Sequence, residues 1–287
     1  MIDLVLFPSS YFSGKIVEPD MKKEHDAAVS TGLFDTVLFD NAKWFDEKKL
    51  VLNKEFPTKQ NAIMRGWMMK PECYELFYSE LLKRNIRLVT TPAEYAKMHI
   101  FPNIYSVFGE DTSKMLIFPL HEEIPLERVK KEFDRFMIKD FVKSVKGTKF
   151  PRYFDASVTQ DEFNEWMKVF YELRGNLLTG GICVKQFLDL KFYGDRPNEY
   201  RVFYANNEIA TICRNSGQPN YSPEPPKSML EKYRNLSSPY YTVDYAELAD
   251  GTWKVLEAGD GSVSGLSDNQ DAGEYFRILS FAFNNKI

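Results

Sequence analysis

The stretch TVDYAELADGTWKVLEAGDGSVSG, residues 242–265, alternates apolar and polar residues as β-structure does, and it carries several acidic side chains. Asp250 and Gly251 are a strong signal for a two-residue turn, so we expect an antiparallel hairpin. The register set by this turn predicts three favourable cross-strand pairs, Leu248–Trp253, Glu247–Lys254 and Tyr245–Leu256. The same register places Asp244 directly opposite Glu257.

The pair of acids at residues 244 and 257 is unfavourable by itself, because like charges directly opposite one another destabilise a sheet. The register also puts this pair on an apolar face, with Ala246, Leu248, Trp253 and Val255. A divalent cation would remove the repulsion, and Asp260 could supply a third oxygen ligand. A few carboxylates are typical of Mg²⁺ sites that are completed by water and phosphate. The alternative is a pair of acids on a solvated sheet edge, or one protonated carboxyl.

Basic residues that suit a phosphate lie elsewhere in the chain. Lys139 ends the apolar run FMIK, where a desolvated lysine acts as a fixed point charge, and further lysines follow at 143, 146 and 149. Arg201 lies among apolar residues in NEYRVFY and therefore needs an anionic partner: Glu199, Asp244 or a phosphate. The sequence contains no Walker A loop and no GxGxxG, and its three histidines are isolated.

The order of elements predicts a mixed α/β (α+β) chain. Strands at 2–7, 36–40, 61–69 and 86–90 alternate with helices at 18–32, 71–85 and 92–100, which is typical of a small unit with a parallel sheet. Residues 101–125 read as irregular, and we place a boundary near residue 102. Beyond it we expect strands at 135–143 and 180–193, a helix at 159–175, a hairpin turning at Asn206–Asn207, a loop at 217–226 and a helix from Asp271.

Composition limits the class of protein. The chain has 287 residues, a net charge of −4 and 44% hydrophobic residues, which suits packed domains and argues against a protein-wide basic field for nucleic acid. The three cysteines are far apart and form no CxxC pair, so we expect neither disulfides nor a zinc site. The sequence shows no signal peptide and no membrane span, and a reducing, cytoplasmic location is expected.

The order Lys139, GGICVKQFLDL, EYRVF and TVDYAE…ADGTWKVLEAGDG resembles the ATP-grasp superfamily. RGWMMKPECY, KDFVKS, LRGNLLTGGICVKQF and EAGDGSVSGL further resemble a bacterial and phage branch of it. The resemblance implies an N-terminal pre-ATP-grasp α/β domain over residues 1–102. It also implies an ATP-grasp catalytic domain over residues 103–287, with two α+β subdomains at roughly 103–187 and 188–287 that grip ATP.

The same resemblance implies roles for single residues. Lys139 and Arg201 would be the catalytic cations, and Asp244, Glu257 and Asp260 would hold Mg²⁺. The residues that would contact ATP are Lys139, Lys143, Lys185, Gln186, Phe187, Leu188 and Asp189, with the base read by the Gln186 carbonyl and the Leu188 amide. The sequence departs from the family in two places: Asp260 replaces an asparagine that usually lies nearer the glutamate, and Lys185–Gln186 replaces the usual acidic hinge residue.

The implied activity is that of an Mg²⁺- and ATP-dependent ligase with an unknown acceptor. We favour the joining of a carboxylate to an amine, and the alternative is an ATP-dependent RNA ligase that seals RNA ends through an adenylate. A nucleotide-binding regulatory module is disfavoured, because binding alone does not need three acids at the phosphates. Residues expected to border the acceptor are Arg65, Trp67, Lys146 and Arg174. The sequence leaves the oligomeric state open.

Overall fold

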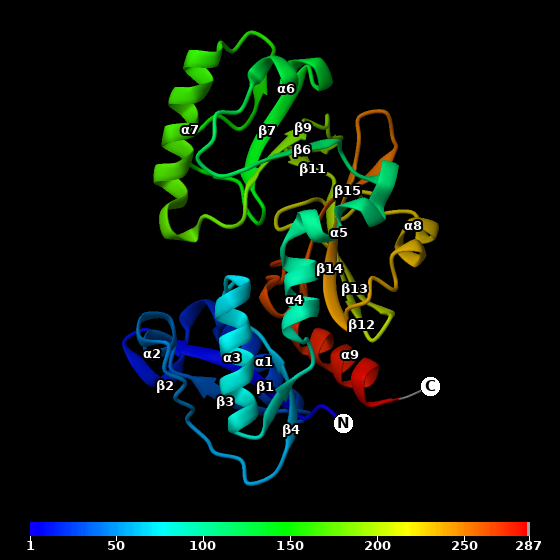
Figure 1. Ribbon diagram of the computed structural model, residues 1–287. Coiled ribbons are helices and arrows are strands. Elements are labelled where there is room, and N and C mark those ends of the chain that lie inside the picture. Colours follow the sequence, from blue (N-terminus) through cyan, green and yellow to red (C-terminus); the bar gives the residue numbers. More distant parts are fainter. Residues whose placement is uncertain (286–287) are drawn as a thin grey trace.

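The computed structural model describes residues 1–285, and it begins with a five-stranded sheet. Strands β1, β3, β4 and β5 pair in parallel, as predicted, and β2 adds an antiparallel edge that the sequence did not suggest. The strands are β1 (Leu4–Ser10), β2 (Ser13–Val17), β3 (Asp35–Phe39), β4 (Gln60–Met64) and β5 (Ile86–Leu88). Figure 1 shows this unit, in blue and cyan, at one end of the molecule.

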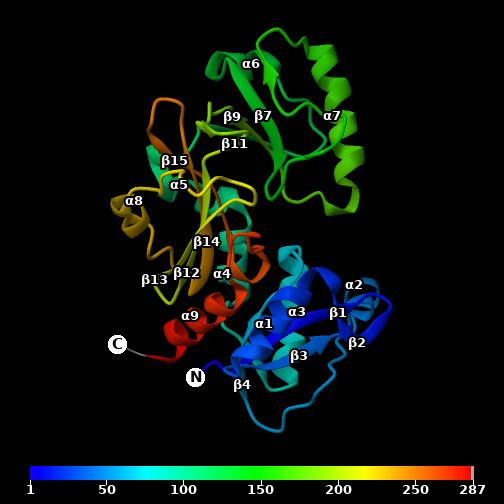
Figure 2. The same ribbon diagram turned by 180° about the vertical axis from the view of Figure 1, so that it is seen from behind.

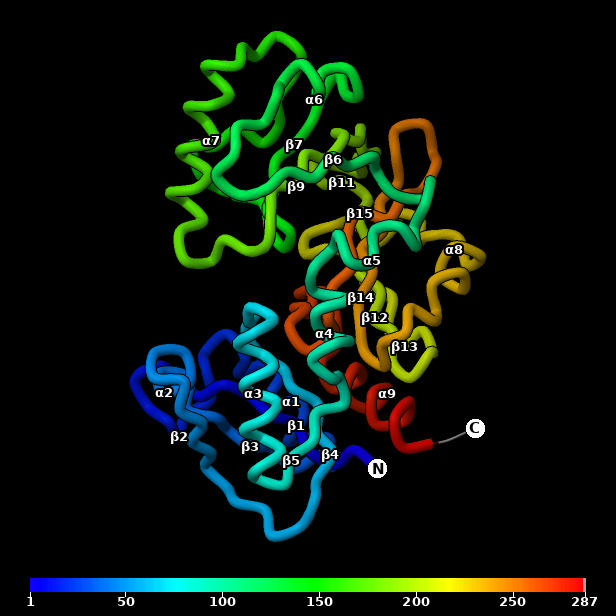
Figure 3. The backbone as a smooth tube through the Cα atoms, in the orientation of Figure 1, coloured from blue at the N-terminus to red at the C-terminus, as the bar shows by residue number. Residues whose placement is uncertain are grey.

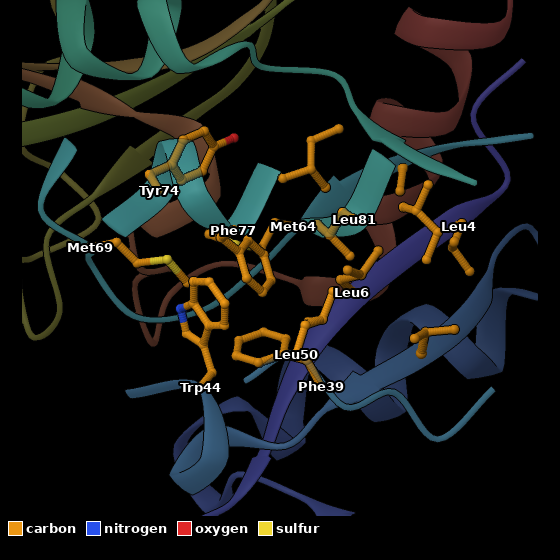
Figure 4. Close-up of a cluster of buried hydrophobic side chains, with 14 of the residues drawn as sticks. Leu4, Leu6, Phe39, Trp44, Leu50, Met64, Met69, Tyr74, Phe77 and Leu81 are labelled. Carbon is orange, nitrogen blue, oxygen red and sulfur yellow. The ribbon is translucent and has the colours of Figure 1, made fainter. Parts of the chain in front are cut away.

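Helices cover both faces of this parallel sheet. They are α1 (Lys22–Thr31), α2 (Asn41–Glu47), α3 (Pro71–Lys83) and α4 (Pro92–His99), with a short 3₁₀ turn at Pro19–Met21. The predicted end of α1 is confirmed, because Gly32 takes the left-handed conformation (φ +67°) that glycine adopts without strain. On one face Trp44, Phe39 and Phe77 pack into a buried cluster under α3 (Figure 4). The other face shares its core with α9 (Ala272–Asn284).

Residues 101–125, expected to be irregular, contain regular structure instead. Helix α5 spans Phe101–Phe108, a 3₁₀ turn spans Gly109–Asp111, and β6 spans Met115–Phe118. The proline at 102 does not oppose α5, because a proline in the first turn of a helix interrupts no intrahelical hydrogen bond. The apolar side of α5 packs on the sheet that contains β15.

A lobe that we call the α6–α7 lobe consists of a four-stranded antiparallel sheet and two helices on one of its faces (Figures 1 and 2). The sheet order is β6-β9-β7-β8. The remaining elements are α6 (Leu126–Glu132), β7 (Arg135–Asp140), β8 (Phe154–Asp155), α7 (Gln160–Arg174), a 3₁₀ turn (Gly175–Leu177) and β9 (Ile182–Gln186). The predicted strand at 135–143 and helix at 159–175 are therefore confirmed.

A second antiparallel sheet, which we call the β12–β15 sheet, has the order β13-β12-β14-β15. The predicted hairpin turn at Asn206–Asn207 is confirmed, with both residues at positive φ. The elements are β12 (Glu199–Ala205), β13 (Glu208–Arg214), α8 (Lys227–Lys232), β14 (Tyr240–Glu247), β15 (Trp253–Asp260), a 3₁₀ turn (Gly261–Val263) and α9, with a small hairpin of β10 (Phe192–Tyr193) and β11 (Arg196–Pro197) before them.

The opening hairpin forms as β14 and β15, but with a bulge. The predicted pair Asp244–Glu257 is confirmed, whereas the register shifts between Asp244 and Tyr245. Towards the turn the observed pairs are Tyr245–Val255, Ala246–Lys254 and Glu247–Trp253, so the three pairs predicted there are wrong by one residue. The bulge turns Val255 onto the face of Tyr245 and into the core, away from the face of the two acids.

The β12–β15 sheet lies between the parallel unit and the α6–α7 lobe, as the tube view shows along the chain (Figure 3). Its helix-free face next to the α6–α7 lobe carries the side chains described below. Within residues 1–285, no helix has the length and apolar character needed to cross a membrane.

Candidate active site

Four charged side chains form a row that joins the β12–β15 sheet to the α6–α7 lobe. Arg201, Asp244 and Glu257 are cross-strand neighbours on β12, β14 and β15. Arg201 grips Asp244 with two hydrogen bonds, Nε to Oδ1 at 2.8 Å and Nη2 to Oδ2 at 2.7 Å. The Nζ of Lys139 on β7 forms an ion pair with Glu257. The row therefore reads cation, acid, acid, cation, and it bridges the two sheets.

The acids of this row remain charged because of their basic neighbours. Burial by itself raises the pKa of Glu257, but Lys139 outweighs this effect with help from Lys185 and Arg201, so the net pKa is lowered. Asp244 raises the pKa of Arg201, which stays fully protonated. Two adjacent ionised carboxylates suit Mg²⁺, which needs only one or two protein carboxylates when phosphates complete its shell.

Asp260 does not join these two acids. It lies three residues beyond Glu257 on the same strand and therefore faces the opposite side of the sheet. Its side chain is fully buried, Oδ1 accepts a hydrogen bond from the Ser262 amide at 2.9 Å, and burial raises its pKa to about 7. Within residues 1–285, no three His, Cys, Asp or Glu side chains gather as a metal site. The predicted three-acid metal site is thus reduced to Asp244 and Glu257.

Two buried lysines lie side by side above the row. Lys139 and Lys185 are on neighbouring strands and face the same side of the sheet, since Lys139 pairs with Cys183. The Lys185 Nζ donates to the carbonyl of Leu256 at 2.7 Å and lies 4.4 Å from the centre of the Phe101 ring. Burial, followed by the charge of Lys139, lowers the pKa of Lys185 to about 7. An anion between the lobes would relieve this repulsion, as a phosphate chain would.

The predicted hinge connects the two sheets. The Gln186 amide donates to Lys114 O and the Phe187 amide to Arg135 O, both at 2.9 Å, so the chain leaves β9 along the edge of the α6–α7 lobe. The Asp189 carbonyl then accepts from the Ala249 amide at 2.9 Å, at the tip of the β14–β15 hairpin. Leu188 lies between these anchor points, partly exposed.

An aromatic cluster borders the hinge. The guanidinium carbon of Arg135 lies 4.2 Å from the ring centres of both Phe187 and Tyr153. No local pattern in the sequence pointed to this cluster, because the three residues come from separate segments of the α6–α7 lobe. It limits the hinge on its solvent side.

Arg174 is not available for a substrate, contrary to our prediction. It pairs with the fully buried Asp140 at 2.8 Å. The other oxygen of Asp140 accepts hydrogen bonds from the amides of Val142 and Lys143, both at 2.7 Å. This ion pair therefore anchors the loop that follows Lys139, while Lys143 and Lys146 on that loop remain exposed.

Arg65 is likewise unavailable, because it is only 2% exposed. Its guanidinium binds Glu24 through Nε at 2.6 Å and Nη2 at 3.0 Å, and it donates to the carbonyls of Gly261 and Ser264. The prediction that Arg65 contacts the acceptor is wrong: the residue clamps the 261–265 loop to the parallel unit. The same loop accepts from Arg201 Nη1 through Gly265 O at 3.1 Å, so the clamp holds a neighbour of the charged row.

Trp67 lies next to this clamp and is 38% exposed. The preceding Gly66 donates its amide to Ser262 O at 3.0 Å, which keeps Trp67 near the 261–265 loop. The residue stays a candidate for an acceptor contact. Sequence reasoning had treated His99 as isolated, but it lies buried near the row, where burial lowers its pKa to about 4 and keeps it neutral.

A family model for an ATP-grasp domain, the one described as family 3 of its clade, matches residues 128–279. The match covers more than half of the chain, and the protein belongs to this ATP-grasp family. Its fold is that of the ATP-grasp ligases. No curated protein matches the sequence significantly.

Solved structures match the whole fold at low identity. The ATP-grasp ligase PsnB, complexed with a phosphomimetic variant of a minimal precursor, Mg and ADP, has a TM-score of 0.62 at 12% identity and covers 97% of this chain and 98% of its own. D-cycloserine synthetase DcsG has a TM-score of 0.63 at 13% identity, with 96% and 98% covered. The D-alanine-D-alanine ligase from Coxiella burnetii has a TM-score of 0.62 at 10% identity, with 98% and 93% covered.

Proposed function

We propose that the protein is an Mg²⁺- and ATP-dependent ligase that joins a carboxylate to an amine. The observation that carries this proposal is the charged row: two adjacent carboxylates on one sheet, flanked by Arg201 and by Lys139 from the facing lobe. Metal-bound phosphates need this combination of oxygen ligands and cations at short range.

The residues of the row take defined roles in this proposal. Asp244 and Glu257 would hold Mg²⁺, which supplies charge neutralisation at the phosphates when bound. Lys139, Lys185 and Arg201 would bind phosphate oxygens, exchanging their present partners for the nucleotide. Lys143 on the loop after β7 would contact the phosphate chain from the α6–α7 lobe.

The hinge would bind the nucleoside. The Gln186 carbonyl and the Leu188 amide would read the edge of adenine, Phe187 would pack beside it, and Asp189 would bind the ribose. The Arg135 cluster against Phe187 supports this role, because it gives the hinge a rigid outer wall. We retain the division into residues 1–102 and 103–287, with subdomains at roughly 103–187 and 188–287, as part of the proposal.

In the proposed reaction a carboxylate oxygen attacks the terminal phosphorus of ATP, the bond to the bridging oxygen breaks, and ADP leaves. The amine nitrogen then attacks the carbon of the acyl phosphate. Inorganic phosphate departs, the amine loses one proton, and an amide is formed. Lys139 and Arg201 would stabilise the charge on the transferred phosphoryl group, because fixed cations in a partly desolvated site need no reorganisation during the reaction.

Two observations support amide formation over RNA sealing. The similar folds include a D-alanine-D-alanine ligase and a ligase complexed with a precursor peptide. Arg65, one of the residues expected to grip RNA, is buried in an ion pair with Glu24. Trp67 and Lys146 are exposed and remain candidates for contacts with the acceptor.

The product of ATP turnover tests this proposal. The protein is incubated with Mg-ATP and a panel of amino acids and short peptides, and in parallel with 5′-phosphorylated RNA. Acceptor-dependent ADP and phosphate are expected, and they should be absent from the Glu257→Gln variant. AMP that appears only with RNA would contradict amide ligation.

A further inference from the structure

A pocket of roughly 440 Å³ opens between the α6–α7 lobe and the β12–β15 sheet, apart from the row. Its walls come from the segment before β8, the β10–β11 hairpin and the turn after β13. The residues used below are Arg152, Phe192, Asp195, Arg196, Asn215 and Ser216. Its volume is within the range of small-molecule sites.

The pocket contains two arginines that lack a close acidic partner. Within residues 1–285, Arg152 takes part in no ion pair, and the nearest acid to Arg196 is Asp195, with Nε and Oδ2 4.0 Å apart. Both members of that pair are more than half exposed, so their attraction is weak. The Arg196 guanidinium lies across Gly217, where an added Cβ would come within 3.3 Å of Nε. Arginines presented from two lobes suit a planar oxyanion.

The pocket borders the far end of the row from Lys139. Asn215 donates through Nδ2 to the Glu199 carboxylate at 2.9 Å. Glu199 lies two residues before Arg201 on β12, and therefore on the same face of the sheet. Arg152 lies close enough to Glu199 to affect its carboxyl electrostatically. Across the sheet the order is Lys139, Glu257, Asp244, Arg201 and then the pocket, which lies where a substrate would extend from the terminal phosphate.

We propose that this pocket is a recognition subsite for a carboxylate of the substrate, remote from the reacting atoms. The inference rests on the proposed ligase function and adds a substrate class to it: an amino acid or peptide with an acidic side chain. The two arginines bind the carboxylate, Asn215 and Ser216 offer further hydrogen bonds, and Phe192, which is 55% exposed, packs on the carbon chain.

The choice of a carboxylate over a phosphate follows from the charge balance. Asp195 and Glu199 lie beside the two arginines, so the local positive charge is largely compensated. A singly charged carboxylate replaces one weak acidic partner at little cost. A doubly charged phosphate would meet repulsion from both acids.

Calorimetric titration with two probes tests the inference. N-acetyl-glutamate α-amide carries the side-chain carboxylate, and N-acetyl-glutamine α-amide is its neutral isostere. Both are titrated into the full chain with Mg-ADP present. The glutamate probe should bind at least tenfold more tightly, and Arg152→Gln or Arg196→Gln should each weaken it about tenfold, since hydrogen bonds between charged groups are the strong ones. Arg87→Gln, an exposed arginine on β5, is the matched control and should bind as the wild type does.

Equal binding of the two probes, no binding of the glutamate probe, or arginine variants that bind it normally would each overturn the inference. Tighter binding of a 5′-phosphorylated oligoribonucleotide, lost in the same two variants, would overturn it in favour of a phosphate site. The thermal shift with Mg-ATP separates this inference from the ligase proposal: it should persist in both variants, and its absence from the wild type would count against the ligase proposal instead.

Discussion

Replacing Arg65 by methionine should destabilise the protein strongly, although the residue lies in a segment that the sequence suggested for substrate binding. The side chains of Arg65 and Glu24 are 2% and 9% exposed, and they form a two-pronged ion pair. Methionine has a similar length but leaves the Glu24 carboxylate buried without its cation. Removing one partner of a buried pair costs about 3–5 kcal/mol.

The size of the loss can be divided by a double-mutant cycle. Arg65→Met with Glu24→Leu removes both charges, so we expect the double variant to regain at least ~2 kcal/mol over Arg65→Met alone. Recovery should stay incomplete, because the carbonyls of Gly261 and Ser264 lose their donor.

Urea denaturation of the four proteins in the cycle provides the free energies of unfolding. An exposed ion pair serves as the control: Arg84 and Glu55 are 42% and 68% exposed, so Arg84→Met should cost less than ~1 kcal/mol. The reasoning is refuted if Arg65→Met unfolds at the same urea concentration as the wild type, or if the coupling between the two sites is below ~0.5 kcal/mol.

The charged row and its surroundings lead to three further predictions. Asp244→Asn and Glu257→Gln should each lower ATP turnover at least about 100-fold, with urea midpoints near that of the wild type; normal turnover in folded variants would remove the metal assignment. ATP should stabilise the protein more than GTP in a thermal shift with Mg²⁺, because backbone groups at Gln186 and Leu188 read the base; equal shifts would contradict the hinge. Lys185, with its pKa lowered to about 7, binds fewer protons than its unfolded counterpart between pH 7 and about 10, so its contribution to stability rises with pH across that window; the unfolding free energy of the wild type relative to Lys185→Met should therefore increase from pH 7 to pH 9 by ~1–3 kcal/mol, and an unchanged difference would contradict the lowered pKa.

The parts of the fold that depend on local signals could be predicted from the sequence. Alternating apolar strands, Gly32 after α1 and the two asparagines of the β12–β13 hairpin fix their elements through short-range geometry. The pairing of Asp244 with Glu257 was also predictable. The bulge beside it was not, because no single residue marks the place where one strand gains a residue.

The candidate site could be predicted only where its residues follow the strand pattern. Lys139, Arg201 and the two acids lie on regular strands, so their relation could be anticipated. Arg65 and Arg174 were misjudged because their partners, Glu24 and Asp140, are 41 and 34 residues away in the chain. Nothing near either arginine distinguishes one that serves an internal carboxylate from one that serves a ligand.

The most direct test of the account is a crystal structure of the protein with Mg²⁺ and a non-hydrolysable ATP analogue. We predict a magnesium ion about 2.1 Å from carboxylate oxygens of both Asp244 and Glu257, with Lys139 and Arg201 on the phosphates and the base against residues 186–188. Nucleotide bound elsewhere, or Asp244 and Glu257 still paired only with Arg201 and Lys139 beside a bound nucleotide, would contradict it.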